Sequence, residues 1–182
     1  QGDVRQFVAY SGTTTSYAAA NYQSVGGVTG QGTISNWLLS PELSLQNGST
    51  ITVYTRTVSG SLFPDRLEVR LSKNGTSTNV GSGTEATGDF TTLLLSINPS
   101  LDAGGYPDTG WTQYSVSLSG ISGTGVGRIA FRYYVTDAGS NANNSNYVGI
   151  DDFSYENVLP VTLLNFIGTI QDNKAFLTWS TP

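Results

Sequence analysis

The chain has 182 residues, of which 12% are charged, 37% hydrophobic and 11% aromatic, and its formal net charge is −5. This length and apolar content suit one sizeable hydrophobic core and exclude a disordered polyelectrolyte. The acidic balance, with only eight Lys and Arg scattered along the chain, argues against a nucleic-acid partner, and no stretch reaches the roughly 18 apolar residues of a membrane span.

The sequence contains neither Cys nor His. Without Cys there is no disulfide, zinc-thiolate site or thiol nucleophile. Without His the commonest general base is missing, so mechanisms of the Ser-His-Asp or Cys-His type are excluded. Any bound metal is expected to be a hard ion that prefers oxygen ligands, such as Ca²⁺.

Strand patterns recur along the chain and are separated by clusters of Gly, Asn, Ser and Pro. Helical periodicity is almost absent, and the one helix-favouring stretch, 17–21, is too short to be stable alone. Strands are predicted at 4–10, 36–40, 50–58, 66–73, 90–97, 111–119, 128–136 and 146–155.

Several predicted strands alternate apolar and polar residues, which is typical of antiparallel sheets with one buried and one polar face. Two Asn-Gly pairs, at 47–48 and 74–75, favour tight hairpin turns. The residues predicted to point inward are Leu67, Val69 and Leu71 in one strand, Tyr114, Val116 and Leu118 in a second, and Ile129, Phe131, Tyr133 and Val135 in a third.

Eight or so short strands with long polar loops predict an all-β fold, a jelly-roll β-sandwich of two antiparallel sheets over residues 1–157. An immunoglobulin-like sandwich is less favoured because it is usually shorter, at about 100 residues. Residues 158–182 are predicted to be a linker and a C-terminal β-hairpin that turns at 171–174. Since two strands do not form an independent domain, this tail either packs on the main domain or begins a truncated second β domain.

Three segments together resemble the choice-of-anchor J domains, relatives of the cleaved-adhesin domains of bacterial surface proteins: NWLLSPELSL (36–45), GRIAFRYYVT (127–136) and YVGIDDFSY (147–155). Residues 70–99 add to the resemblance, which covers about residues 1–156. It implies a jelly roll of the galactose-binding-like or MAM-like kind, exported from a bacterial cell and held extracellularly or at the cell surface. It also implies a non-catalytic adhesion or binding module, with calcium sites in relatives.

The tail, residues 159–182, separately resembles the lead-in to fibronectin-like segments that precede type IX secretion sorting domains.

Asp151 and Asp152 stand side by side in a stretch that otherwise predicts a strand. Neighbours in a strand point to opposite faces, so the two carboxylates are not expected to act on one substrate. Glycoside hydrolysis, which needs two carboxylates roughly 5–10 Å apart in one cleft, is therefore disfavoured. Asp152 shares the parity of Val148 and Ile150 and is predicted to point inward.

Three interpretations of this pair remain open. In the first, Asp152 and Asp151 bind Ca²⁺ together with N-terminal groups such as Asp3, as the resemblance suggests. In the second, the inward carboxylate forms an ion pair with Arg132 of the preceding strand. In the third, one Asp accepts hydrogen bonds from a loop backbone and the other is solvated.

The loop 100–111 is a candidate ligand site. Tyr106 and Trp111 are candidates to stack on a sugar ring, and Asp102 and Asp108 to accept hydrogen bonds from its hydroxyls. The alternative is that Trp111 packs into the core and Tyr106 covers a loop.

The predicted function is a non-catalytic, exported cell-surface module for adhesion or ligand binding, with a glycan or a host or extracellular protein as partner. The alternative is a carbohydrate-binding module attached to a larger secreted enzyme. The sequence predicts no oligomeric state.

Overall fold

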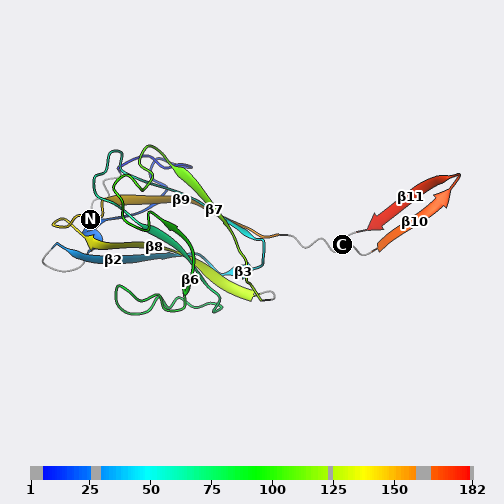
Figure 1. The fold of residues 1–182 in the computed structure, drawn as a ribbon, viewed down its shortest axis with the longest axis horizontal. Helices are drawn as coiled ribbons and strands as arrows, with labels where there is room; N and C mark the ends of the chain where they lie inside the picture. Colours follow the sequence, from blue (N-terminus) through cyan, green and yellow to red (C-terminus); the bar gives the residue numbers. More distant parts are fainter. Residues whose placement is uncertain (1–5, 26–29, 123–124, 159–164, 181–182) are drawn as a thin grey trace.

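The computed structural model describes residues 6–25, 30–122, 125–158 and 165–180. Two antiparallel sheets pack face to face (Figure 1), which confirms the predicted all-β sandwich. The four-stranded sheet has the order β1 (Ala18–Asn21), β9 (Tyr147–Glu156), β4 (Thr50–Thr57) and β7 (Thr112–Ser117). The five-stranded sheet has the order β2 (Gly32–Leu39), β8 (Gly125–Ala138), β5 (Leu67–Ser72) and β6 (Thr92–Ile97), with β3 (Leu43–Leu45) paired to β8.

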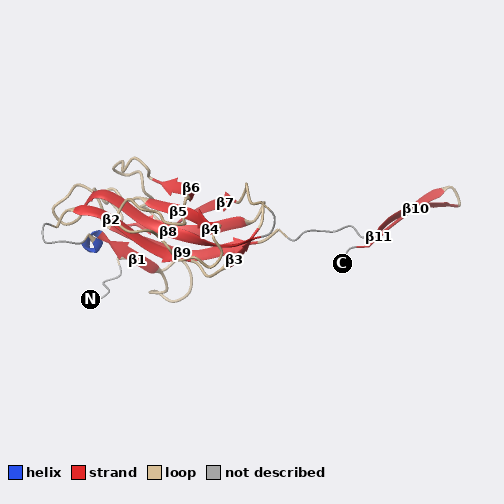
Figure 2. Cartoon of the chain, turned by 90° about the horizontal axis from the view of Figure 1, so that it is seen from below, coloured by secondary structure: helices blue, strands red, loops and turns tan. Residues whose placement is uncertain are grey.

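Figure 2 shows that strands and loops make up nearly all of the described chain. The short 3-10 helix η1 (Tyr22–Ser24) follows β1, and its first turn is capped by the Asn21 side chain, which accepts a hydrogen bond from the Gln23 backbone N–H at 2.9 Å. In the part of the chain that the structure describes, no helical segment has the length and apolarity that crossing a membrane requires.

The core lies between the two sheets and is built from the alternating residues of each strand. β4 shows the alternation over its whole length, with Ile51 and Val53 almost completely buried. Fully burying one such side chain contributes about 1.5–3 kcal/mol. All seven inward residues predicted for β5 and β8 are buried. Of those predicted for the strand at 111–119, Leu118, which follows β7, is buried, while Tyr114 and Val116 are only half-buried.

The predicted strand at 4–10 is wrong over its described part, because residues 6–10 form an irregular segment. The strand that pairs with β9 on this edge is β1, which lies within the helix-favouring stretch 17–21, with Ala18 opposite Ile150. Pairing with β9 overrides a weak local preference. The short strand β3 was also not predicted.

The two Asn-Gly pairs do not form hairpin turns. Gly48 and Gly75 both adopt positive φ values, 87° and 53°, as such turns require. However, Asn47-Gly48 carries the chain from β3 in one sheet to β4 in the other, and Asn74-Gly75 opens the long loop 73–91. The Asn-Gly dipeptide favours a reversal of the chain, but pairing with strands distant in sequence decides which sheet the next strand joins.

The loop 73–91 covers the outer face of the five-stranded sheet. Phe90 is fully buried and its ring lies 5.7 Å from that of Trp37 on β2. The face of β5 that carries Glu68 was predicted to be polar, and it is polar but buried, since Glu68 is only 6% exposed.

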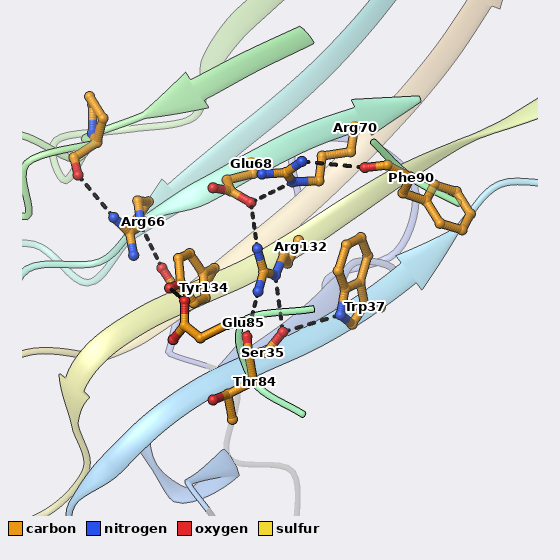
Figure 3. Close-up of polar contacts among 11 residues, drawn as sticks. Ser35, Trp37, Arg66, Glu68, Arg70, Thr84, Glu85, Phe90, Arg132 and Tyr134 are labelled. Atoms are coloured by element: carbon orange, nitrogen blue, oxygen red, sulfur yellow. Dashed lines mark hydrogen bonds and ion pairs between the residues drawn. The ribbon is translucent and has the colours of Figure 1, made fainter. Parts of the chain in front are cut away.

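Arg132 on β8 lies at the centre of this covered face (Figure 3). Its Nη1 is 3.2 Å from Glu68 Oε2, its Nε donates to Ser35 Oγ at 3.0 Å, and its Nη2 donates to the carbonyl of Thr84 at 2.5 Å. The guanidinium also lies 3.8 Å from the centre of the Tyr134 ring. Every side of this buried cation therefore has a partner.

The proposed ion pair between Arg132 and the Asp151–Asp152 motif is wrong. Arg132 alternates with Phe131 and Tyr133, which point into the core, so its side chain points to the outer face of its own sheet. β9 belongs to the other sheet, on the opposite side of the core.

Glu68 is shared by two cations, because Arg70 Nε lies 2.7 Å from the same Oε2 atom. Burial alone would raise the pKa of Glu68, but Arg70 and Arg132 together outweigh burial and hold the pKa below its usual value.

The C-terminal hairpin consists of β10 (Asn165–Gln171) and β11 (Lys174–Ser180) and confirms the predicted turn at 171–174. Asp172 and Asn173 both have positive φ, 49° and 60°, as a two-residue type I′ turn requires. Cross-strand pairs put Phe166 with Trp179 on one face, together with Ile170 and Leu177. All residues of both strands are exposed, so the sandwich does not cover this apolar face.

Removing residues 159–182 is expected to leave the thermal stability of the sandwich unchanged, because β10 and β11 bury nothing against it. Val158 is kept, since its carbonyl accepts a hydrogen bond from Gln46 Nε2. The melting temperatures of the two chains, measured by circular dichroism, should agree within about 2 °C, which corresponds to well under 1 kcal/mol. A larger drop would show that the tail packs on the main domain.

Glu68→Gln is expected to cost about 3 kcal/mol in the free energy of unfolding, because it leaves the buried guanidinium of Arg132 and the partly buried one of Arg70 short of a counter-charge. Glu42→Gln is the matched control: its pair with Arg128 is also 3.2 Å long, but the Glu42 side chain is 46% exposed. The control should cost under about 0.5 kcal/mol. If urea titrations gave the two variants equal losses in the free energy of unfolding, the ion pairs of Glu68 with Arg70 and Arg132 would not stabilise the fold as proposed.

The same variant should change the acid sensitivity of the fold. Since the pKa of Glu68 lies below 4.5 in the folded chain, its stabilisation is complete above pH 4.5 and is lost as the pH falls through the folded value. The stability difference between the wild type and Glu68→Gln should therefore shrink at more acidic pH, when urea titrations are repeated from pH 6 downward in about one-unit steps.

Candidate functional site

A β-bulge explains the adjacent carboxylates in β9. Tyr54 of β4 pairs with Asp151 and Thr52 with Ser154, so Asp152 and Phe153 together oppose the single residue Val53. Asp152 takes the left-handed conformation, with φ 51°, which Asp tolerates better than most residues.

The bulge shifts the parity of the strand. Val148 and Ile150 face the core before it, whereas Phe153 and Tyr155 do so after it. Asp152 is exposed, so the prediction that it points inward is wrong. Simple alternation does not hold across the extra residue.

Asp151 holds the N-terminal loop, which we define as residues 6–16. Its Oδ2 accepts hydrogen bonds from the backbone N–H groups of Tyr10 and Ser11, at 2.8 and 3.2 Å. Its Oδ1 accepts from the N–H of Asp152 at 2.9 Å. The structure thus agrees with the third interpretation, in which one carboxylate binds a loop backbone and the other is solvated.

The calcium interpretation of this motif stays a prediction, because the structure describes only part of its ligand set. Three N–H donors already occupy three of the about four acceptor sites of the Asp151 carboxylate, which leaves it little capacity to bind a cation. Among the described residues, no three acidic side chains gather in a way that could hold a metal ion. Asp3, the predicted N-terminal ligand, lies outside the described residues.

The four residues of loop 100–111 do not converge on one site. Tyr106 is only 4% exposed, and its hydroxyl is 2.6 Å from Thr55 Oγ1, so its ring is not available to stack on a sugar. Trp111 is half-buried; its Nε1 donates to the Val8 carbonyl at 2.9 Å and its ring packs edge-on against Phe7.

The two acids of this loop also have different surroundings. Asp108 Oδ2 accepts the N–H of Gly60 at 3.0 Å, whereas Asp102 is exposed. The prediction of a sugar site in this loop is therefore wrong, because the rings of Tyr106 and Trp111 pack against other parts of the fold.

Asp65 is a buried acid enclosed by hydrogen-bond donors. Its carboxylate accepts from the Tyr133 hydroxyl at 2.6 Å, from Thr57 Oγ1 at 2.7 Å and from the N–H of Asn146 at 2.8 Å. Burial raises its pKa, against the lowering effect of these hydrogen bonds. With no exposed surface, this carboxyl group cannot reach a substrate.

A cavity of about 200 Å³ opens between the sheets, near the edge strands β1 and β2. Ala18, Ala20, Leu38 and Phe131 are among its lining residues, and Asn36 contributes an amide. No carboxylate lines this cavity, so it does not provide the acids of a hydrolytic site.

The outer face of the four-stranded sheet carries only polar side chains and Tyr54 in three rows across β7, β4 and β9. We call this surface the open face, and its rows are Gln113–Tyr54–Asp151, Ser115–Thr52–Ser154 and Ser117–Thr50–Glu156. The side chains are linked along the surface: the Tyr54 hydroxyl donates to Gln113 Oε1 at 2.8 Å, and Thr52 Oγ1 lies 3.2 Å from Ser115 Oγ.

Tyr10 lies on the open face. Its ring stacks on that of Tyr54, with centroids 3.8 Å apart and planes 16° apart, and the residue is still 46% exposed. The hydrogen bond from its N–H to Asp151 fixes its backbone next to Tyr54. Sequence reasoning missed this pair, since the two tyrosines are far apart in the chain and no spacing signals the contact.

The fold is similar to solved structures of adhesin domains. One is the K3 cleaved adhesin domain of Lys-gingipain from Porphyromonas gingivalis w83, with a TM-score of 0.50 and 21% identity over 78% of this chain and 74% of that chain. Another is the K2 cleaved adhesin domain of Lys-gingipain, with a TM-score of 0.49 and 21% identity over 84% of this chain and 77% of that chain.

No protein-family model and no curated protein matches the chain. The likeness to the K3 domain confirms the adhesin-domain fold that the sequence resemblance implied.

Asp151→Asn and Asp152→Asn form a matched pair that tests the role of the bulge. The first is expected to cost about 1 kcal/mol or more, because an amide replaces one of the two acceptor oxygens. The second should stay within about 0.5 kcal/mol, because Asp152 is exposed and Asn also tolerates its φ. Unfolding in urea measures both values.

Limited proteolysis gives a second measurement of the same pair. Cleavage within residues 6–16 should be faster in Asp151→Asn than in the wild type and unchanged in Asp152→Asn. Equal cleavage in both variants would contradict the assignment of Asp151 as the residue that holds the loop.

Proposed function

We propose that this chain is a non-catalytic, exported cell-surface module that binds an extracellular partner through its open face. The observation that carries the proposal is the difference between the two outer faces of the sandwich. One is buried beneath loop 73–91, whereas the other is uncovered, polar, and carries an exposed ring held in place by Asp151. A surface of this kind suits recognition of a partner.

The comparisons support the same proposal. The K3 structure is described as a cleaved adhesin domain of Lys-gingipain, and this chain has a similar fold. The choice-of-anchor J resemblance adds export and attachment to a bacterial surface. A composition poor in charge and free of Cys is compatible with such a location.

Three acids of the sandwich have structural partners, which supports a non-enzymatic role. Asp151 accepts three backbone hydrogen bonds, Asp65 is sealed in the core, and Glu68 is shared by two arginines. In glycosidases, by contrast, two carboxyl groups face each other across a substrate-sized gap.

We also propose that residues 158–182 are a linker and the first hairpin of a further β unit. The apolar face of Phe166, Ile170, Leu177 and Trp179 is uncovered. Since two strands are marginally stable alone, additional strands against this face would stabilise it.

A binding experiment with one variant on each outer face of the sandwich tests the proposal. Ser115→Arg places a long cation in the middle of the open face, whereas Ser82→Arg adds the same side chain to an exposed position of loop 73–91. Binding to immobilised extracellular-matrix proteins and cell-surface glycans should fall about tenfold or more for the first and stay unchanged for the second.

Two results would contradict the proposal. One is equal binding by Ser115→Arg and Ser82→Arg, and the other is turnover of any glycan in the panel by the purified chain.

A further inference from the structure

We propose that the ligand of the open face is an uncharged glycan and that one of its sugar rings stacks on Tyr10. This inference rests on the proposed function and adds the chemical class of the ligand and the residues that bind it. It replaces the sugar site predicted in loop 100–111, whose aromatic residues are turned inward.

Tyr10 provides a stacking surface that is already in position. One side of its ring rests on Tyr54 at a centroid distance of 3.8 Å, and the other side faces solvent. The axial C–H groups of a pyranose ring present an apolar surface that matches an aromatic face. Because Asp151 fixes the backbone of Tyr10 and Tyr54 supports its ring, little conformational freedom is lost when a sugar binds.

The neighbouring side chains provide hydrogen bonds of both kinds. Gln113 carries an amide whose oxygen accepts from Tyr54 and whose Nε2 lies 3.3 Å from Ser115 Oγ. The hydroxyls of Ser115 and Thr52 can each donate or accept, as sugar hydroxyls do. Neighbouring strands lie about 4.8 Å apart, and Gln113 pairs directly with Tyr54, the residue on which the Tyr10 ring stacks.

The charges of this surface favour an uncharged glycan over an anionic one. The open face holds Asp151 and Glu156 and no Lys or Arg, and the exposed Asp152 lies beside it. Arg56, at the adjoining end of β4, is engaged, with its guanidinium 4.5 Å from the centre of the Phe7 ring and 3.1 Å from the Asp108 carbonyl. Sialylated or sulfated glycans would meet uncompensated carboxylates there.

The competing explanation is that Tyr10 only shields Tyr54 from water. In that case Tyr10 contributes to stability alone, and removing it changes no binding. The two explanations differ in a measurable way, since only a sugar-binding role makes affinity depend on the outer side of the ring.

The experiment is a titration of the full chain with neutral oligosaccharides of glucose, mannose and galactose, followed by calorimetry. Tyr10→Ala should weaken binding about tenfold, near the upper end of what one aromatic contact supplies. Tyr10→Phe keeps the ring and should bind like the wild type. Tyr22→Ala removes a comparably exposed tyrosine from η1 and is the matched control, expected to leave affinity unchanged.

Thermal melting of each variant separates loss of binding from loss of fold. A Tyr10→Ala chain that melts like the wild type but no longer binds would support the site. A sialylated oligosaccharide that binds more tightly than its neutral counterpart would overturn the uncharged-ligand assignment.

Absence of binding to every neutral oligosaccharide would overturn the inference as a whole. The proposed function would survive that result if Ser115→Arg still abolished binding to an extracellular protein, so the two failures can be told apart.

Discussion

The carboxylate of Asp151 connects the β-bulge of β9 to the N-terminal loop and the open face. It belongs to a bulge that adds one residue to β9 opposite Val53. Its oxygens accept the backbone N–H groups of Tyr10, Ser11 and Asp152, so three donors that would otherwise need water are satisfied at one point. Without this group the N-terminal loop loses its backbone hydrogen bonds to β9 and keeps contacts with Tyr54, Arg56 and Trp111.

The bulge also matters for the core. Beyond it, Phe153 faces inward and meets Phe131 of the opposite sheet, with the rings edge-on and 5.3 Å apart. Without the extra residue, the parity of the strand would place Asp152 where an apolar side chain is needed. The bulge thus keeps the carboxylate of Asp152 out of the core and leaves that of Asp151 to bind the N-terminal loop. Bulges often have such roles next to functional surfaces.

The two outer faces of the sandwich differ because of what covers them. On the five-stranded sheet, Arg132 and Glu68 are satisfied by each other, by Arg70 and by the Thr84 carbonyl of loop 73–91 (Figure 3). On the four-stranded sheet, short hydroxyl and amide side chains meet solvent, and only Tyr10 and its loop lie on one corner. The proposed recognition of a partner therefore falls on the second face.

Much of the fold follows from local patterns. Alternation in 66–73 and 128–136 predicted the inward residues correctly, because a buried face demands apolar side chains at every second position. The turn at 171–174 was equally predictable, since Asp172 and Asn173 tolerate left-handed backbone conformations. By contrast, the Asn-Gly pairs indicated where the chain reverses but not which sheet it joins next.

The candidate site was far less predictable. Tyr106 and Trp111 have the residue types of a sugar platform, yet their surroundings bury them, and burial depends on strands distant in sequence. Tyr10 and Tyr54 carry no spacing signal, because a loop and a strand 44 positions apart meet only after β4, β9 and the N-terminal loop have assembled.

The amino-acid sequence by itself determined the class of fold and the exclusion of His- and Cys-based chemistry, since the first follows from the two-residue repeat of the strands and the second from composition. The tertiary structure alone decided which carboxylate is solvated, which outer face is covered and which aromatic ring is exposed. These depend on strand register and on long-range packing, and a single inserted residue in β9 reverses the parity of the residues that follow it.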